Sequence, residues 1–221
     1  MKNNKLYWIL GAVCMVNLLG HALCLPMMPE QVPVHWNWAG VADGFGPKWS
    51  ALATGLLPLG LLLLFRVLPS IDPKGENFAK FRPIWNGMVL GTILFGCAVS
   101  WLSELAVFGI LKDGSGATGL LVGGGIGLLF ILLGNYMPRI KQNYTFGCRT
   151  PWALADEHNW NRTQRMGGFV FILIGASTLL SGVFAGALGF SGTLIVLLGT
   201  TLLGCVWIYL YSFLVFKGWM K

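Results

Sequence analysis

A short polar stretch between two long apolar runs carries several side chains that are able to do chemistry. Residues 28–49 read MPEQVPVHWNWAGVADGFGPKW and include a histidine, an asparagine, an aspartate and a lysine. A histidine beside an aspartate can exchange a proton or bind a metal, whereas an amide and an ammonium group can hydrogen-bond a polar ligand. We therefore predict a ligand-binding site in this loop, formed by His35, Trp36, Asn37, Trp38, Asp43 and Lys48.

Three tryptophans of the same stretch suit the boundary between lipid and water. The rings of Trp36, Trp38 and Trp49 can lie half in lipid, so interfacial anchoring alone accounts for them. It does not account for the polar side chains between them. Pro29 and Pro33 stiffen the start of the stretch and its glycines permit tight turns, which predicts a compact, ordered segment.

Two further ionisable side chains, His21 and Glu104, lie inside apolar runs. Burial of such groups in a membrane is costly, so each is a candidate functional residue. Two interpretations stay open. Either they form a metal or acid/base site with His35 and Asp43, or they lie near the interface and reach water or each other. No particular metal is predicted.

The composition is that of a membrane protein. Of 221 residues, 55% are hydrophobic and 10% are charged, against about a quarter charged in ordinary soluble domains. The five cysteines form no C-x-x-C pair, so the sequence implies neither a disulfide framework nor a zinc site. We predict no cofactor.

Six apolar runs are long enough to cross a bilayer as helices. We predict an all-α, polytopic fold with spans at Leu6–Leu25, Ala51–Leu68, Ile84–Leu111, Ala117–Met137, Gly167–Gly189 and Thr193–Phe216. The predicted division is an N-terminal membrane domain over 1–83, with its outer loop at 26–50, and a second membrane domain over 84–221, with a cytoplasmic loop at 138–166. In the fourth span, Gly119, Gly123 and Gly127 recur every four residues, which favours a close helix contact inside the bundle over a dimer surface.

The basic residues predict the orientation of these spans. One side of the membrane receives thirteen of the fifteen lysines and arginines: Lys2, Lys5, Arg66, Lys74, Lys80, Arg82, Arg139, Lys141, Arg149, Arg162, Arg165, Lys217 and Lys221. Only Lys48 and Lys112 fall on the other side. We therefore predict cytoplasmic termini, an external loop at 26–50, and contact of the basic residues with membrane lipids rather than nucleic acid.

A second polar segment, residues 143–168, reads NYTFGCRTPWALADEHNWNRTQRMGG. Thr150 followed by Pro151 predicts a helix start, with Thr as the N-cap. Beyond it, Trp160, Thr163 or Gln164, and Gly167 share one helical face, which leaves Arg162 and Arg165 for phosphate headgroups. Two interpretations stay open here: a surface helix lying on the inner face of the membrane, and a binding segment.

Both polar segments resemble a known family. The first is similar to the P-x-x-[VI]-P-x-H-x-N-x-x-G-x-x-D signature of bacterial membrane domains that commonly precede an SdpI-type domain. The second resembles the SdpI domain pattern N-x-x-x-G-x-R-T-P-W-T-L. Matching residues of the second motif include Asn143, Gly147, Arg149, Thr150, Trp160 and Arg165. Ala153 replaces the usual threonine, and Gln164 stands where histidine or asparagine is common.

This resemblance implies a membrane protein of the SdpI-type immunity family, which protects a bacterium from a secreted toxic peptide. It also implies a cytoplasmic partner, because the best-known member holds a transcriptional repressor at the membrane. On this hypothesis the outer loop binds an amphipathic peptide in the headgroup layer. The segment from Arg149 to Arg165 then changes shape or captures the partner. The expected location is the bacterial cytoplasmic membrane.

Two other classes of function remain open, although the sequence favours a non-enzymatic role. An integral-membrane enzyme requires His21, His35, Asp43 and Glu104 to converge within a few ångströms. A small transporter requires broken helices that meet in mid-membrane, for which only Pro58 gives an indication.

Overall fold

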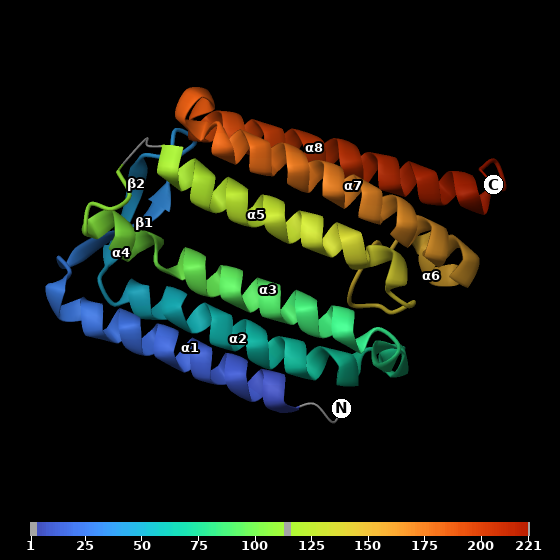
Figure 1. Ribbon diagram of the computed structural model, residues 1–221, viewed down its shortest axis with the longest axis horizontal. Coiled ribbons are helices and arrows are strands. Elements are labelled where there is room, and N and C mark those ends of the chain that lie inside the picture. Colours follow the sequence, from blue (N-terminus) through green and yellow to red (C-terminus); the bar gives the residue numbers. More distant parts are fainter. Residues whose placement is uncertain (1–3, 113–115, 221) are drawn as a thin grey trace.

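The computed structural model describes residues 4–112 and 116–220. Six helical spans in this part of the chain are long and apolar enough to cross a membrane, and they lie side by side (Figure 1). They are α1 (Asn4–Cys24), α2 (Ser50–Ile71), α3 (Arg82–Ser100) continued by α4 (Leu102–Val107), α5 (Gly116–Tyr136), α7 (Glu157–Val183) and α8 (Ala185–Phe216). The predicted helical fold with six spans is confirmed.

The spans form two groups of three. Helices α1, α2 and α3 contact one another, as do α5, α7 and α8, and contacts between α3 and α5 join the two groups. One end of the bundle carries a β-hairpin and is called the hairpin end below. The opposite end carries α6 (Pro151–Ala155), the start of α1 and the end of α8, and is called the α6 end (Figure 1).

The loop after α1 folds as a two-stranded hairpin, for which the sequence predicted order but no strands. After the short 3-10 helix η1 (Leu25–Met27), β1 (Gln31–Trp36) pairs antiparallel with β2 (Ala42–Pro47). The Asn37 side-chain oxygen accepts hydrogen bonds from the backbone N–H groups of Ala39 and Val41, at 2.9 and 3.1 Å, and so closes the turn. Gly40 supplies the left-handed backbone of the turn, with φ +75°.

The glycines of α5 lie at a helix contact inside the bundle, as predicted. A Cβ atom on Gly127 would lie 2.6 Å from the backbone nitrogen of Leu179 in α7. Likewise, a Cβ atom on Gly175 of α7 would lie 2.6 Å from the carbonyl oxygen of Gly127. The two backbones approach closely only because neither position has a side chain.

The last two spans differ from the prediction at their starts. Helix α7 begins at Glu157, not at Gly167, and Asp156 caps it by accepting a hydrogen bond from the backbone N–H of Asn159 at 2.6 Å. The surface-helix interpretation of this segment is therefore wrong, because its first residues continue directly into a membrane span and bury one face. Helix α8 begins at Ala185, and Gly189, with φ +71°, interrupts it before the predicted start at Thr193.

The α6 end is held by an aromatic and aliphatic core that joins the two groups of spans. Trp85 packs edge-on against Phe65, Phe78 and Phe146, with ring centroids 4.9–6.0 Å apart. Phe146 belongs to the connection between α5 and α6, so this cluster attaches that connection to α2 and α3. The connection thereby becomes part of the folded body.

Candidate functional site

The predicted polar residues of the hairpin form two exposed pairs. His35 Nδ1 lies 2.6 Å from Asp43 Oδ1, and their side chains are 70% and 44% exposed. Lys48 Nζ donates to Glu30 Oε1 at 2.8 Å. Both pairs lie at the hairpin end, where a ligand can reach them. By contrast, the side-chain oxygen of Asn37 is already occupied in the turn.

Large apolar side chains surround these pairs. Trp38, Phe45 and Trp49 are 51–63% exposed, whereas Trp36 is half-buried. A groove of ≈ 420 Å³ lies between the hairpin and the segment from Ala106 to Lys112. Its lining is mostly apolar and includes Pro33, Phe45, Val107 and Leu111, with Lys112 at its edge. The hairpin end therefore combines aromatic surface with charge, as a site for an amphipathic molecule requires.

His21 and Glu104 meet in the interior, below the hairpin. His21 Nδ1 contacts Glu104 Oε1, and both side chains are almost fully buried. His21 also stacks on Trp101, with ring centroids 4.3 Å apart. Helix α2 approaches the imidazole through Gly55, whose Cβ would lie 2.5 Å from His21 Cδ2. The interpretation that the two side chains reach each other is therefore confirmed; neither reaches water.

The hydrogen bonds around His21 connect the pair to α3. Ser100 Oγ lies 3.1 Å from His21 Nε2, and the Ser100 hydroxyl donates to the Cys97 carbonyl oxygen at 2.7 Å. The contact between the imidazole and the carboxyl group lowers the cost of burying both in the membrane interior. The second carboxyl oxygen, Oε2, is buried without a hydrogen-bond partner.

The four ionisable residues of the enzyme hypothesis form two separate pairs. Within residues 4–112 and 116–220, no three His, Cys, Asp or Glu side chains lie close enough to hold a metal ion together. Ser103, next to Glu104, donates to the carbonyl oxygen of Pro33 at 2.6 Å and so ties the hairpin to α4. The convergence of all four side chains that an enzyme would need is thus not observed among these residues.

At the α6 end, predicted motif residues hold the connection between α5 and α7 in shape. The Asn143 side chain is buried; its oxygen accepts from the backbone N–H groups of Thr145 and Phe146, and its amide donates to carbonyl oxygens of the same turn. Gly147 has φ +104°, and a Cβ there would lie 2.6 Å from Gln164 Oε1. Only glycine satisfies both conditions.

Gln164, which stands where the family pattern has histidine or asparagine, hydrogen-bonds the backbone of Cys148. Its side-chain oxygen accepts from the Cys148 N–H at 3.0 Å, and its nitrogen donates to the Cys148 carbonyl at 2.9 Å. Burial raises the pKa of the Cys148 thiol to about 12, with a smaller contribution from Cys205. Cys148 is therefore a weak nucleophile at neutral pH.

Thr150 and Trp160 also make structural contacts. Thr150 caps α6, as predicted, by accepting from the Ala153 N–H at 3.1 Å, and its hydroxyl bonds Ser212 of α8. Trp160 is fully buried and donates to the Ile140 carbonyl oxygen at 2.8 Å. Arg149 and Arg165 are different, because both side chains are exposed.

Sequence reasoning missed Asp72, a buried carboxylate after α2. Its oxygens accept from the backbone N–H groups of Lys74 and Tyr144 at 2.8 and 2.9 Å, and from the Thr145 hydroxyl at 2.6 Å. This side chain ties the end of α2 to the connection after α5. The sequence feature that could have identified Asp72 is its position as an acidic residue directly after an apolar span.

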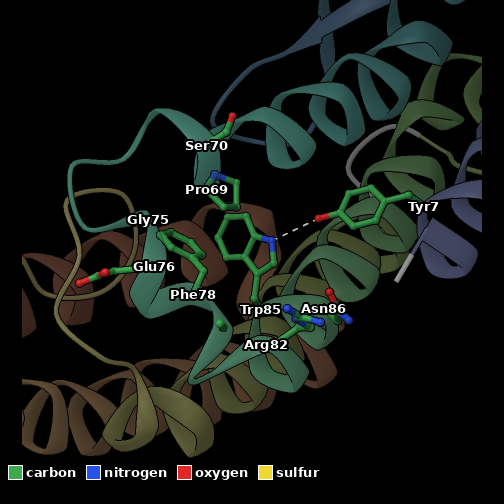
Figure 2. Close-up of a pocket in the computed structure, with 10 residues that line it drawn as sticks. Tyr7, Pro69, Ser70, Gly75, Glu76, Phe78, Arg82, Trp85 and Asn86 are labelled. Carbon is green, nitrogen blue, oxygen red and sulfur yellow. Dashed lines mark hydrogen bonds between the residues drawn. The ribbon is translucent and has the colours of Figure 1, made fainter. Parts of the chain in front are cut away.

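The sequence also gave no indication of a cavity of ≈ 270 Å³ at the α6 end. Figure 2 shows Trp85 among the residues that line it, with the indole N–H directed at the Tyr7 hydroxyl, 3.2 Å away. Arg82 and Asn86 lie side by side at the start of α3 and add polar groups to the lining. The cavity draws on α1, α2 and α3 together, so no local pattern could have revealed it.

Six spans, an ordered hairpin and a hydrogen-bonded connection at opposite ends define a multi-pass membrane protein with two specialised extramembrane segments. Residues 139–212 match the SdpI/YfhL protein family, and residues 12–59 match a domain of unknown function, DUF1648. The chain is similar to Immunity protein SdpI of Bacillus subtilis (strain 168), with 26% identity over 186 residues and 84% of each chain covered. The resemblance to the SdpI family is thus confirmed. No solved structure matches the chain.

Proposed function

We propose that this chain is a membrane immunity protein that protects a bacterium from a secreted, membrane-active toxic peptide. The observation that carries the proposal is the similarity to Immunity protein SdpI over 84% of both chains. The matches of both polar segments to family domains support it. The proposed location is the cytoplasmic membrane, with the hairpin outside.

In this proposal the hairpin binds the peptide. The pairs His35–Asp43 and Lys48–Glu30 are exposed beside Trp38 and Phe45, so polar and apolar contacts lie within one small surface. A membrane-active peptide is amphipathic and concentrates in the headgroup layer. The aromatic rings would contact its apolar side, and the ionic pairs its polar side.

The connection around Arg149 is proposed to relay binding to a cytoplasmic transcriptional repressor. Arg149 donates to the Tyr144 carbonyl oxygen at 2.5 Å, which orients its guanidinium at the surface of a well-bonded connection. A partner with acidic groups could bind such a guanidinium. Because the hairpin and this connection lie at opposite ends, the relay requires a change of state that both segments share.

The hairpin is tested by His35→Ala and Asp43→Ala, each removing one member of the exposed pair. We expect the affinity of the purified chain for the peptide to fall about tenfold, as one lost charge-assisted contact predicts, and toxin survival to fall with it. Glu76→Ala, an exposed carboxylate between α2 and α3, is the control and should change neither. Full binding and survival in both hairpin variants would reject the hairpin as the receptor.

The relay is tested by Arg149→Ala in the same assays, with a reporter of the repressed gene. We expect peptide binding to be retained and the reporter response to be lost, because the side chain is exposed at the end opposite the hairpin. Loss of peptide binding in a well-folded preparation would show that Arg149 only supports the fold.

A further inference from the structure

A second cavity at the α6 end, of ≈ 420 Å³, is distinct from the hairpin and from the cavity in Figure 2. Its lining consists of His158, Asn161, Arg162, Arg165 and Tyr211. None of these described lining residues is acidic, and two carry guanidinium groups. The cavity therefore suits an anion with several hydrogen-bond acceptors, such as a phosphate group.

The lining residues come from facing sides of two helices. On α7, positions 158, 162 and 165 are spaced by four and three residues and so share one face. Across from them, the Tyr211 hydroxyl of α8 accepts a hydrogen bond from Arg162 Nη2 at 3.2 Å, which orients that guanidinium. Arg165 is exposed at the mouth of the same cavity.

The same two faces continue as apolar surface toward the middle of the bundle. On α7, Phe169 and Leu173 follow Arg165 at four-residue spacing and are 60% and 53% exposed. On α8, the face of Tyr211 continues through Trp207 to Leu203, which is 72% exposed. Trp207 Nε1 donates to Met166 Sδ at 3.3 Å, so the two helices touch beneath the cavity. Cationic and apolar surfaces therefore join along one seam.

The cavity lies close to the ends of both helices. Arg165 is eight residues from the start of α7, about 12 Å along the helix axis at 1.5 Å per residue. Tyr211 is five residues from the end of α8. Both are within roughly two turns of the helix ends, whereas the apolar seam extends toward the middle of the helices. A lipid phosphate bound at the cavity would therefore leave its acyl chains along the seam.

We infer that this seam between α7 and α8 binds an anionic phospholipid. The guanidinium groups of Arg162 and Arg165 hold the phosphate, with the Asn161 amide and the Tyr211 hydroxyl as further hydrogen-bonding groups. The acyl chains lie along Phe169, Leu173 and Leu203. Inorganic phosphate shares the headgroup chemistry but leaves the apolar seam unused. The site does not depend on the proposed immunity function.

The test measures lipid retention by the purified full-length chain in detergent, using native mass spectrometry. Phosphatidylglycerol, phosphatidylcholine and inorganic phosphate are titrated separately. We expect phosphatidylglycerol to bind most tightly. Arg162→Gln and Arg165→Gln should each weaken it roughly fivefold, as expected for one basic residue near the membrane surface. Arg139→Gln removes an exposed guanidinium elsewhere at the same end and should have no such effect.

A third variant, Phe169→Gln, alters only the exposed apolar seam, so folding should be retained. This variant should weaken the binding of phosphatidylglycerol and leave the binding of inorganic phosphate unchanged. The site would be overturned if phosphatidylcholine bound as tightly as phosphatidylglycerol. It would also be overturned if Arg165→Gln and Arg139→Gln lost the same amount of phosphatidylglycerol affinity. Binding of inorganic phosphate as tight as that of phosphatidylglycerol would show a small-anion site and overturn the lipid assignment. Circular dichroism and gel filtration of each variant control for misfolding.

Discussion

At the scale of single residues, the His21–Glu104 pair shows how this membrane protein tolerates ionisable groups. Glu104 contacts one imidazole nitrogen and Ser100 contacts the other, while Trp101 stacks on the ring. Asn17 extends the network by donating to Gly55 O and accepting from Trp101 Nε1. The second carboxyl oxygen of Glu104, Oε2, is buried without a hydrogen-bond partner, which costs free energy.

Substitution of Glu104 tests how much this buried contact stabilises the fold. In Glu104→Gln the amide keeps the shape of the side chain and can hydrogen-bond Nδ1 of His21, so we expect the free energy of unfolding to change by less than about 1 kcal/mol. Glu104→Ala leaves Nδ1 unpaired beside a void and should cost about 2–4 kcal/mol. Unfolding in denaturing detergent measures both, with Glu157→Ala as the exposed control. Equal losses in Glu104→Gln and Glu104→Ala would show that an amide cannot replace the carboxyl group in this contact.

The sequence was sufficient to identify several structurally important polar residues, but not the residues that they contact. The sequence singled out His21, Glu104, Asn143 and Thr150, and each makes several specific contacts. Asn143 hydrogen-bonds within its own turn, whereas His21 contacts a residue 83 positions away in the sequence. Only the tertiary structure shows which of these two kinds of contact each residue makes. Asp72 was missed because its three donors come from two separate segments.

At the scale of elements, the contact between α5 and α7 depends on the absence of side chains. Gly127 and Gly134 of α5 face Gly175 and Gly168 of α7, and a Cβ at any of these would lie 2.6 Å from backbone of the other helix. Apolar burial contributes little between helices in lipid, so close backbone approach and dispersion supply the association. This face could be predicted from the glycine repeat, whereas its partner helix could not.

Gly127→Ala should therefore separate α5 from α7. The added methyl group meets backbone atoms that cannot rotate away, and we expect a loss of about 1–3 kcal/mol in the free energy of unfolding. Gly199→Ala in α8 is the matched control, because its Cβ would meet nothing within 4 Å. That control should be neutral or slightly stabilising, since alanine favours helix. Equal behaviour of the two variants would mean that the contact between α5 and α7 is looser than described.

The predicted helix boundaries were wrong where buried polar residues find their hydrogen-bond partners in other elements. The start of α7 looked like a loop or surface helix because Asn159, Thr163 and Gln164 are polar. All three are buried and bonded within the bundle, Asn159 by donating to Ser212 O and Gln164 by holding Cys148. The hairpin strands were missed for another reason: six-residue segments containing Pro33, Gly44 and Gly46 carry a weak strand signal.

At the scale of the whole molecule, the orientation across the membrane stays a prediction. The start of α1 and the end of α8 lie at the same end, as six spans require (Figure 1). The division of thirteen basic residues against two predicts that this α6 end is cytoplasmic. Native Cys148 is a poor reporter of that side, because burial raises its pKa to about 12 and leaves little thiolate to react.

Exposed engineered cysteines test the orientation directly. Ala39→Cys places a thiol at the exposed tip of the hairpin, and Ala155→Cys places one on the exposed end of α6. With a membrane-impermeant maleimide, we expect Ala39→Cys to be labelled in intact cells and Ala155→Cys only after permeabilisation. The unsubstituted chain gives the background from its own five cysteines. The reverse pattern would move the hairpin to the cytoplasm, where a secreted peptide could not reach it from outside, and would overturn the receptor proposal together with the orientation. The expected pattern would leave the hairpin accessible to the peptide and place the α6 end, with Arg149, on the side where a repressor is available.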